Sequence, residues 1–280
     1  MTSEGLLAAV GYSEATVSLP LRRIGDAGSS NGFAAIAEEV PVALVYNGKP
    51  HVVVMATPAD LEDLAYGFTI TEGIVMGPAA IEHVDVVKAS HGIELQIQIP
   101  IRDAEALDAR ARNLVARTGC GLCGVESIRE ALRVPVQVEH ALLIHEAALW
   151  RAGEELSARQ TLNNETHTIH GAAWFTADGS TTFVREDVGR HNALDKVCGA
   201  IARDGRMPNA GFLVVTSRAS YEMVQKAATS GVELLAAVSR PTGLAIRFAQ
   251  AANLTLIGVL RGHTANVYTH AERLTTDTSS

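Results

Sequence analysis

Two of the three cysteines in this 280-residue chain, Cys120 and Cys123, lie close together in the stretch "RTGCGLCGVESIREAL". A glycine precedes, separates and follows the pair, which removes side-chain restraint around both sulfur atoms. The sequence predicts a flexible loop over 117–125 that leads into a helix beginning near Val125. The positive N-terminal end of that helix and the nearby Arg117 favour the thiolate, which is the nucleophilic form of a cysteine.

A C-x-x-C pair is compatible with several chemistries. A thiol that collects a group at one surface and releases it at another gains reach from such a loop, and a thiolate can attack a donor's sulfur and hold a persulfide. The alternatives are a structural zinc site, which needs four ligands, a thioredoxin-like redox pair, which normally lies between a strand and a helix, and two incidental cysteines. The third cysteine, Cys198, shares a helical face with Leu194, Val197 and Ile201, so we expect it in the core.

A second group of polar residues follows three expected strands. "GFLVVT" leads into Ser217 and Arg218, "VELLAAV" into Ser239 and Arg240, and "LTLIGVL" into 261–264. Ligands of open α/β sheets bind beyond the carboxyl ends of the strands, and arginines, hydroxyls and helix N-termini in that position hold phosphate. The sequence therefore predicts a crevice for a phosphorylated ligand. The alternative is that each hydroxyl caps the next helix and each arginine is solvated.

The densest polar block is "FVREDVGRHNALDK", where an expected strand ends, a glycine turn follows and a helix begins. Loop residues at such a junction are candidates for a binding site, and we assign Arg190 and His191 to the same crevice. The alternative is a network of caps and ion pairs that orients the helix. In that case His191 is a packed histidine at the rim of the apolar stripe.

The residues around these motifs predict an α/β scaffold. "EEVPVALVYNGKPHVVVMAT" indicates a hairpin with an "NGKP" turn, and the next helix is expected to have Thr57 as N-cap and Pro58 at its first position. Two strands are expected within 81–100, a helix over 103–117, a helix in "HEAALWRAGEEL" and a hairpin turning at Asp178 and Gly179. From residue 190 onwards helices and strands alternate, which predicts parallel pairing.

These elements suggest three parts: a possibly flexible lead-in over 1–30 that ends in the Gly/Ser-rich loop "GDAGSSNG", a smaller α+β subdomain over 31–140 that includes the cysteine loop, and an α/β domain over 141–280. Apolar residues make up 47% of the chain and charged residues 19%, which is globular composition. The formal net charge of −8 argues against general binding to nucleic acid or anionic membranes. No apolar run is long enough to span a membrane. Because the N-terminus lacks a basic segment, it does not resemble a signal peptide, and we expect a cytoplasmic protein.

Five stretches in order resemble the FdhD family of formate dehydrogenase accessory sulfurtransferases, and the resemblance covers about residues 39–270. They are "TPADLEDLAYGFTITEGI", "TGCGLCG", "FVREDVGRHNALDKVCG", "SRASYEMVQKAATSGVELLAAVSRPTGLAIRFA" and "NVYTH". The resemblance implies a homodimer with a cytidine-deaminase-like C-terminal fold. The zinc signature H-x-E followed by P-C-x-x-C is absent, so base deamination is rejected.

The resemblance also implies a sulfur carrier. A cysteine desulfurase supplies persulfide sulfur, and the acceptor is the molybdenum bis(molybdopterin guanine dinucleotide) cofactor, or its tungsten counterpart, before insertion into formate dehydrogenase. Cys120 matches the persulfide position and Cys123 an assisting one. The nucleotide contacts match the stretch after the last strand, and with the crevice residues the expected cofactor-binding set is Ser217, Arg218, Arg240, Arg190, His191, Val259, Leu260, Arg261, Gly262, His263 and Thr264. No permanently bound metal is expected.

Two other classes of function compete with the carrier. A cofactor chaperone would bind the same nucleotide while its cysteines only dock or sense redox state. A thiol–disulfide oxidoreductase would turn over a disulfide substrate. Only the carrier requires that loss of Cys120 abolishes activation of the client while nucleotide binding persists.

Overall fold

The computed structural model describes residues 14–26, 28–89, 91–117, 135–139 and 141–276, and the side chains of 111–117 are not described. The main sheet has the strand order β13-β12-β11-β10-β8-β9. β10, β11 and β12 are parallel, whereas β8 is antiparallel to both β10 and β9, and β13 is antiparallel to β12. The strands are β8 (His170–Thr176), β9 (Thr181–Asp187), β10 (Gly211–Val215), β11 (Leu234–Ala237), β12 (Thr255–Arg261) and β13 (Thr264–Val267).

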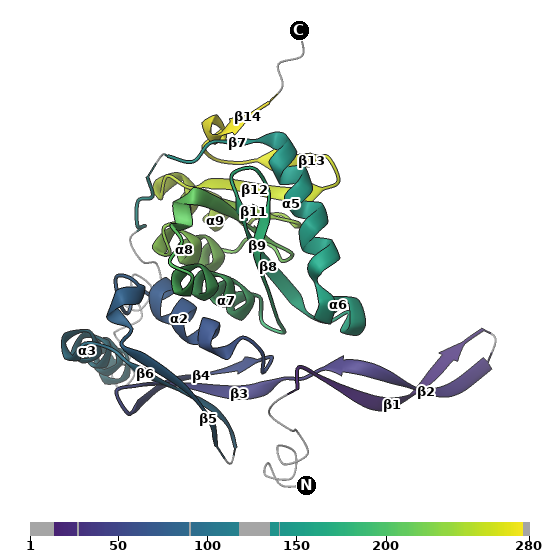
Figure 1. Cartoon of the computed structure of the whole chain (residues 1–280), viewed down its shortest axis with the longest axis horizontal. Helices are drawn as coiled ribbons and strands as arrows, with labels where there is room; N and C mark the ends of the chain where they lie inside the picture. Colours follow the sequence, from purple (N-terminus) through teal and green to yellow (C-terminus); the bar gives the residue numbers. More distant parts are fainter. Residues whose placement is uncertain (1–13, 27, 90, 118–134, 140, 277–280) are drawn as a thin grey trace.

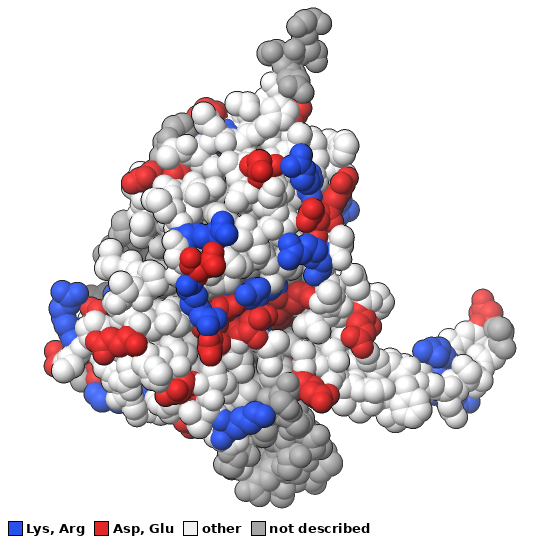
Figure 2. Space-filling model, in the orientation of Figure 1, with Lys and Arg blue, Asp and Glu red and all other residues white. Residues whose placement is uncertain are grey.

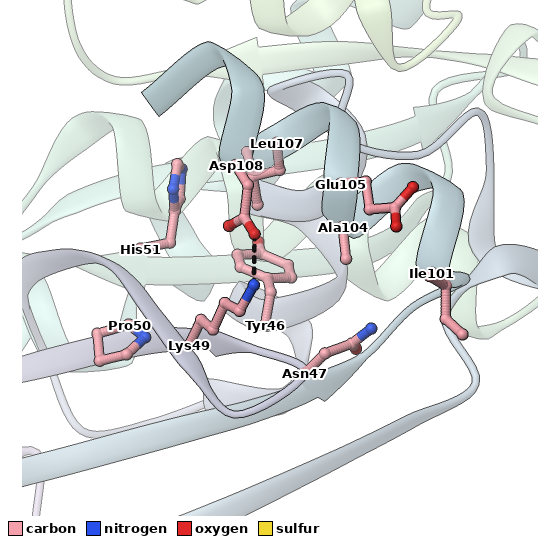
Figure 3. A pocket seen from close by; sticks show the side chains of 10 residues that line it. All are labelled: Tyr46, Asn47, Lys49, Pro50, His51, Ile101, Ala104, Glu105, Leu107 and Asp108. Carbon is pink, nitrogen blue, oxygen red and sulfur yellow. Dashed lines mark hydrogen bonds and ion pairs between the residues drawn. The ribbon is translucent and has the colours of Figure 1, made fainter. Parts of the chain in front are cut away.

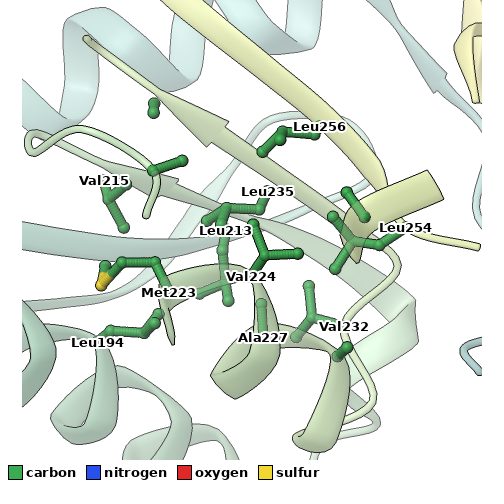
Figure 4. Packing of buried hydrophobic residues seen from close by; sticks show 14 of the residues in the cluster. Leu194, Leu213, Val215, Met223, Val224, Ala227, Val232, Leu235, Leu254 and Leu256 are labelled. Atoms are coloured by element: carbon green, nitrogen blue, oxygen red, sulfur yellow. The ribbon is translucent and has the colours of Figure 1, made fainter. Parts of the chain in front are cut away.

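Helices cover both faces of this sheet (Figure 1). One layer consists of α7 (Arg190–Arg203), α8 (Tyr221–Thr229) and α9 (Gly243–Ala251), and the other contains α5 (Glu146–Arg159), which is followed by α6 (Thr161–Thr166). Trp174 and Leu213 pack toward the first layer, and their neighbours Phe175 and Phe212 toward the second. Because both faces are buried, the central strands are almost uniformly apolar. Figure 4 shows the core beneath α8.

A second sheet of four strands, in the order β4-β3-β6-β5, precedes this body in the chain. It consists of β3 (Val40–Tyr46), β4 (Lys49–Ala56), β5 (His83–Ala89) and β6 (Gly92–Gln98), and it packs with α2 (Leu61–Thr71) and α3 (Ile101–Arg117) around a separate core. The β3–β4 turn has φ 48° at Asn47 and 79° at Gly48. Positive φ at both positions is the hairpin geometry that an Asn-Gly pair favours, which explains the predicted turn.

Helices α2 and α7 join the two sheets at a close crossing. A Cβ atom added at Gly67 would lie 1.7 Å from the carbonyl oxygen of Asp195, and one added at Gly199 would lie 1.9 Å from that of Asp63. The two backbones therefore touch, which only glycine permits at both positions. Figure 2 shows acidic and basic side chains gathered in a band across this part of the surface. At the crossing the buried Asp63 accepts hydrogen bonds from Arg185 at 2.7 Å and from Arg203 at 2.6 Å.

Strands β1 (Thr16–Gly25) and β2 (Gly28–Ala37) form a two-stranded ribbon that projects from the body (Figure 1). The expected loop "GDAGSSNG" is therefore wrong in part, because Gly28–Gly32 pair with 21–25 and only residues 26 and 27 lie between the strands. Small polar residues suggested a loop, but the pairing partner lies upstream. The remaining short elements are η1 (Pro78–Ala80), β7 (Ile144–His145), η2 (Pro208–Ala210), η3 (Ala271–Arg273) and β14 (Leu274–Thr275).

The expected hairpins and the helix–strand alternation after residue 190 are confirmed, and the chain has a mixed α/β fold. The expected cap of α2 is wrong. The helix begins at Leu61, and Thr57 instead accepts a hydrogen bond from Lys196 through its carbonyl and one from Val188 through its hydroxyl. The division near residue 140 stays a prediction. No described helix is long and apolar enough to cross a membrane.

Candidate functional site

The loops after the three parallel strands lie side by side, as expected. The amide of Val238 donates to the carbonyl of Val215, and the amide of Thr242 to that of Ala219, which joins the first two loops. The amide of Val259 donates to the carbonyl of Ser239, which joins the second loop to β12. The carboxyl ends of β10, β11 and β12 therefore form one continuous edge.

Arginine side chains at this edge are not neutralised by acids. Arg218, Arg240 and Arg261 are all exposed, and within the described residues none of the three guanidinium groups has an ion pair or hydrogen bond. Arg247 adds a fourth, because its Nη1 lies 3.6 Å from the Cβ position of Gly243, at the start of α9. The sequence analysis missed Arg247, although its spacing of four residues from Gly243 is one helical turn. Such a cluster attracts a polyanionic ligand.

The N-termini of α7 and α8 meet beside these loops. His191 Nε2 lies 2.9 Å from Glu222 Oε2, which connects the first turns of the two helices. Burial and the positive charge of Arg190 lower the pKa of His191, although Glu222 opposes the shift. The Nε of Arg190 and the Oγ of Ser220 are buried and have no hydrogen-bond partner in the described part of the chain. Both atoms can therefore donate to a ligand at this edge.

Other charged residues of the block 183–196 form buried ion pairs. Lys196 and Asp187 form an ion pair at 2.6 Å in which both side chains are 0% exposed. Lys226 binds Asp195 at 3.0 Å, and although burial alone lowers the pKa of Lys226, Asp195 and Glu72 outweigh it and raise the value. For these residues the expected network of caps and ion pairs is the correct alternative.

The stretch from Val259 to Thr264 contains strained backbone. Val259 has φ 57°, which is rare for a β-branched residue, and the β12–β13 register shifts between Gly258 and Arg261. Leu260 is 3% exposed and packs in the core below α5, so its side chain is not available to a ligand. Gly262 has φ 52°, and the hydroxyl of Thr264 donates to the carbonyl of Arg261, so a tight turn presents Arg261 and His263.

Helix α5 contributes residues that the sequence analysis missed. Trp150 stacks on His263 with ring centroids 6.1 Å apart and an interplanar angle of 18°. Gln160, at the end of the helix, is 5% exposed and its Nε2 has no partner in the described residues. No local signal identifies either residue, because only the fold brings α5 to β8 and to the β12–β13 turn.

Cys120 and Cys123 lie outside the described residues, but the chain on either side of them is placed. Before the gap, Arg110 of α3 donates to the carbonyl of Gly73, at the end of α2. After it, the amide of Val138 donates to the carbonyl of Ala252, just before β12 begins. Both contacts lie toward the amino ends of the parallel strands, opposite the arginine cluster. Cys198 is buried as predicted, and burial raises the pKa of its thiol to about 12.

A cavity of about 310 Å³ lies in the other sheet, between the β3–β4 turn and α3 (Figure 3). Lys49 and Asp108 form an ion pair across it at 2.5 Å. His51 stands edge-on to both Tyr46 and Phe68, and burial lowers its pKa. This cavity belongs to a different sheet from the arginine cluster. No group of three or more His, Cys, Asp or Glu side chains in the described ranges could hold a metal ion.

Comparisons with known proteins show which family this chain belongs to. A sulfur carrier protein FdhD from Xanthomonas campestris pv. campestris is 54% identical over 239 residues, which is 85% of each chain. Relatives of the same name from Cupriavidus necator and Bordetella petrii are 49% and 47% identical over 85% and 90% of this chain, and over 83% and 91% of their own. The crystal structure of a putative formate dehydrogenase accessory protein from Desulfotalea psychrophila has a TM-score of 0.73 at 22% identity. The match covers 94% of this chain and all of the other. Residues 37–275 match the FdhD/NarQ family, and the chain therefore belongs to it.

Proposed function

We propose that this chain is a sulfur carrier protein of formate dehydrogenase maturation and acts as a sulfurtransferase. The observation that carries the proposal is its 47–54% identity, over most of its length, to relatives named sulfur carrier protein FdhD. A cysteine desulfurase is the donor, formate dehydrogenase is the client, and the molybdenum bis-guanine-dinucleotide cofactor is the acceptor that is loaded before insertion. The protein works in the cytoplasm.

The proposed transfer begins at Cys120. Its thiolate attacks the terminal sulfur of the donor's persulfide, so that the donor's S–S bond breaks, a new one forms on Cys120 and the donor leaves as a thiolate. Cys123 can then attack the inner sulfur of the Cys120 persulfide and release the outer one as hydrosulfide. That step leaves a disulfide between the two cysteines, which a cellular thiol reductant must reopen. The buried Cys198, with its raised pKa, takes no part.

The strand-end crevice suits the nucleotide part of the acceptor. A guanine dinucleotide carries phosphate charges, and Arg218, Arg240 and Arg261 are exposed at one edge without acidic partners in the described residues. Arginines bind phosphate oxygens through charge-assisted hydrogen bonds. The acceptor is a substrate here, so the residues hold and release it, and none is needed to form a permanent metal site.

The strand arrangement supports a cytidine-deaminase-like C-terminal fold. In the order β9-β8-β10-β11-β12 four strands run in one direction, and β8, the first in sequence, runs against them. In such a fold the N-termini of α7 and α8 flank the active-site position, and here they carry Arg190, His191 and Ser220. We propose that the family uses this position for ligand binding rather than for deamination.

We also propose that the protein is a homodimer. A two-stranded ribbon is only marginally stable alone, yet the projecting ribbon exposes 83% of Ile24 and 68% of Phe33. Exposed apolar side chains on such an arm suit an interface with a second copy. Sedimentation of the wild type and of Phe33→Glu tests this, since a dimer that uses the ribbon dissociates more readily in the variant.

Mass spectrometry tests the carrier itself. After incubation with a desulfurase and cysteine, we expect the wild type and Cys198→Ala to gain the mass of sulfur, which a reductant removes, and Cys120→Ala to gain none. If Cys120→Ala acquires sulfur at full yield, the role of Cys120 is refuted. The competing cofactor chaperone predicts instead that Cys120→Ala still activates formate dehydrogenase. For the carrier, the variant binds guanosine diphosphate normally but fails to activate the client.

A further inference from the structure

Trp150 and Glu154 lie one helical turn apart on α5 and face the turn between β12 and β13. Trp150 stacks on His263, and Glu154 Oε1 lies 3.6 Å from His263 Nε2. The Glu154 and His263 side chains are 68% and 73% exposed, whereas Trp150 is half-buried against the core. An aromatic ring, a solvent-accessible carboxylate and the exposed Arg261 therefore occupy one patch of surface.

This patch is held in place by backbone packing. A Cβ atom added at Gly153 would lie 3.5 Å from Leu260 Cδ2, so α5 lies directly against β12 between Trp150 and Glu154. On the other side the Thr264 hydroxyl donates to the Arg261 carbonyl at 3.0 Å and closes the turn. The helix and the turn are thus fixed relative to each other, which a recognition site needs.

The three groups match three parts of a guanine nucleotide. Aromatic side chains provide stacking surfaces for any base. The Watson–Crick edge of guanine carries two donors, N1–H and N2–H₂, and a carboxylate can accept from both. Adenine presents an acceptor at N1 and a donor only at N6–H₂, so the same carboxylate binds it less well. A nearby arginine can bind the phosphates.

We propose that Trp150 and Glu154 select the guanine base of the nucleotide ligand, with the base stacked beside His263 on the indole, its donors on Glu154 and its phosphates toward Arg261. This proposal rests on the nucleotide binding of the proposed function and names the residues that give it base specificity. Trp150 and Glu154 lie on a neighbouring helix, outside the strand-end loops. The strand-end motifs of the sequence therefore do not identify them.

The test is to titrate the full-length protein with guanosine diphosphate, adenosine diphosphate or inorganic pyrophosphate. Calorimetry and tryptophan fluorescence measure the binding of each. The other tryptophan, Trp174, is 1% exposed, so a change on binding reports Trp150. We expect guanosine diphosphate to bind about tenfold more tightly than adenosine diphosphate, the range that a bidentate base contact provides, and to quench the fluorescence.

Three variants separate the contributions. Glu154→Gln should lose most of the preference for guanine, whereas Glu165→Gln, which removes the same charge from an exposed position on α6, should keep it. Trp150→Ala should weaken binding of both nucleotides, and Trp150→Phe should bind normally without the quench. If guanosine diphosphate binds but Glu154→Gln retains the full preference, the inference is overturned while the crevice stands. If neither nucleotide binds to the wild type, the proposed nucleotide site fails as well.

Discussion

Gly199→Ala tests the crossing of α2 and α7 that joins the two sheets. The added methyl group would lie 1.9 Å from the carbonyl oxygen of Asp63, whereas ordinary contacts begin at 3.4 Å. The helices must therefore separate by about 1.5 Å, and overpacking of a tight core costs about 1–3 kcal/mol or more. The separation also stretches the hydrogen bonds of Asp63 to Arg185 and Arg203.

Alanine also has an advantage over glycine inside a helix, about 1 kcal/mol. For Gly199→Ala this gain offsets only part of the overpacking and the weakened ion pairs. We expect a net destabilisation of about 1–3 kcal/mol, which at about 2–4 °C per kcal/mol lowers Tm by roughly 2–12 °C.

Gly153→Ala is the matched control, because it makes the same change inside a helix where the new methyl group meets Leu260 at an ordinary 3.5 Å. We expect it to be neutral or to raise the free energy of unfolding by up to about 1 kcal/mol. Thermal and urea denaturation of both variants measure the difference. Equal Tm values for Gly199→Ala and Gly153→Ala would refute the close crossing of the two helix backbones.

Three further predictions concern buried or half-buried groups. Lys196→Met leaves Asp187 as an unpaired buried charge and should cost about 3–5 kcal/mol of unfolding free energy, whereas Lys49→Met, which breaks a surface ion pair, should cost less than about 1 kcal/mol; urea denaturation distinguishes them. Burial lowers the pKa of His51 below the usual 6.5. As the pH falls, this histidine is therefore protonated in the unfolded chain before it is protonated in the folded one. Stability should therefore fall as pH drops below about 6.5, and less steeply in His51→Gln, as denaturation at a series of pH values will show. With its pKa raised to about 12, Cys198 should not react with a disulfide reagent at pH 8 until the protein is unfolded, and reaction in the native state would contradict its burial.

Local signals in the sequence predict the elements of this fold well. The Asn47-Gly48 turn, the Asp178-Gly179 turn and the alternation after residue 190 are each specified by neighbouring residues, and all are present. Asn253 has φ 58° after α9, a left-handed conformation that asparagine tolerates at a helix end. The strand-end loops are brought together by parallel pairing alone, so their adjacency is also predictable.

Contacts between distant segments account for what the sequence analysis missed. Thr57 has the residue type of an N-cap, but its backbone and hydroxyl bond to residues more than a hundred positions away. From the sequence alone, Trp150 is only one apolar residue of a predicted helix. Its contact with the β12–β13 turn depends on where the fold places α5. Strand β2 begins with "GSSNG", which has no apolar side chain to distinguish it from a loop.

The positions of the chain that flanks the cysteine pair and of the arginine cluster constrain how a carrier can work. The chain on both sides of the cysteine pair is attached toward the amino ends of the parallel strands, at Gly73 and at Ala252, whereas the arginines lie at the carboxyl ends. A strand such as β10, Gly211–Val215, spans about 17 Å. In the proposed transfer, either the segment must be long enough to cross that distance, or the proposed ligand must span it with its nucleotide and metal ends. Shortening the segment between α3 and Val138 distinguishes these: it abolishes transfer but spares nucleotide binding if the segment must cross, and leaves both intact if the ligand spans the sheet.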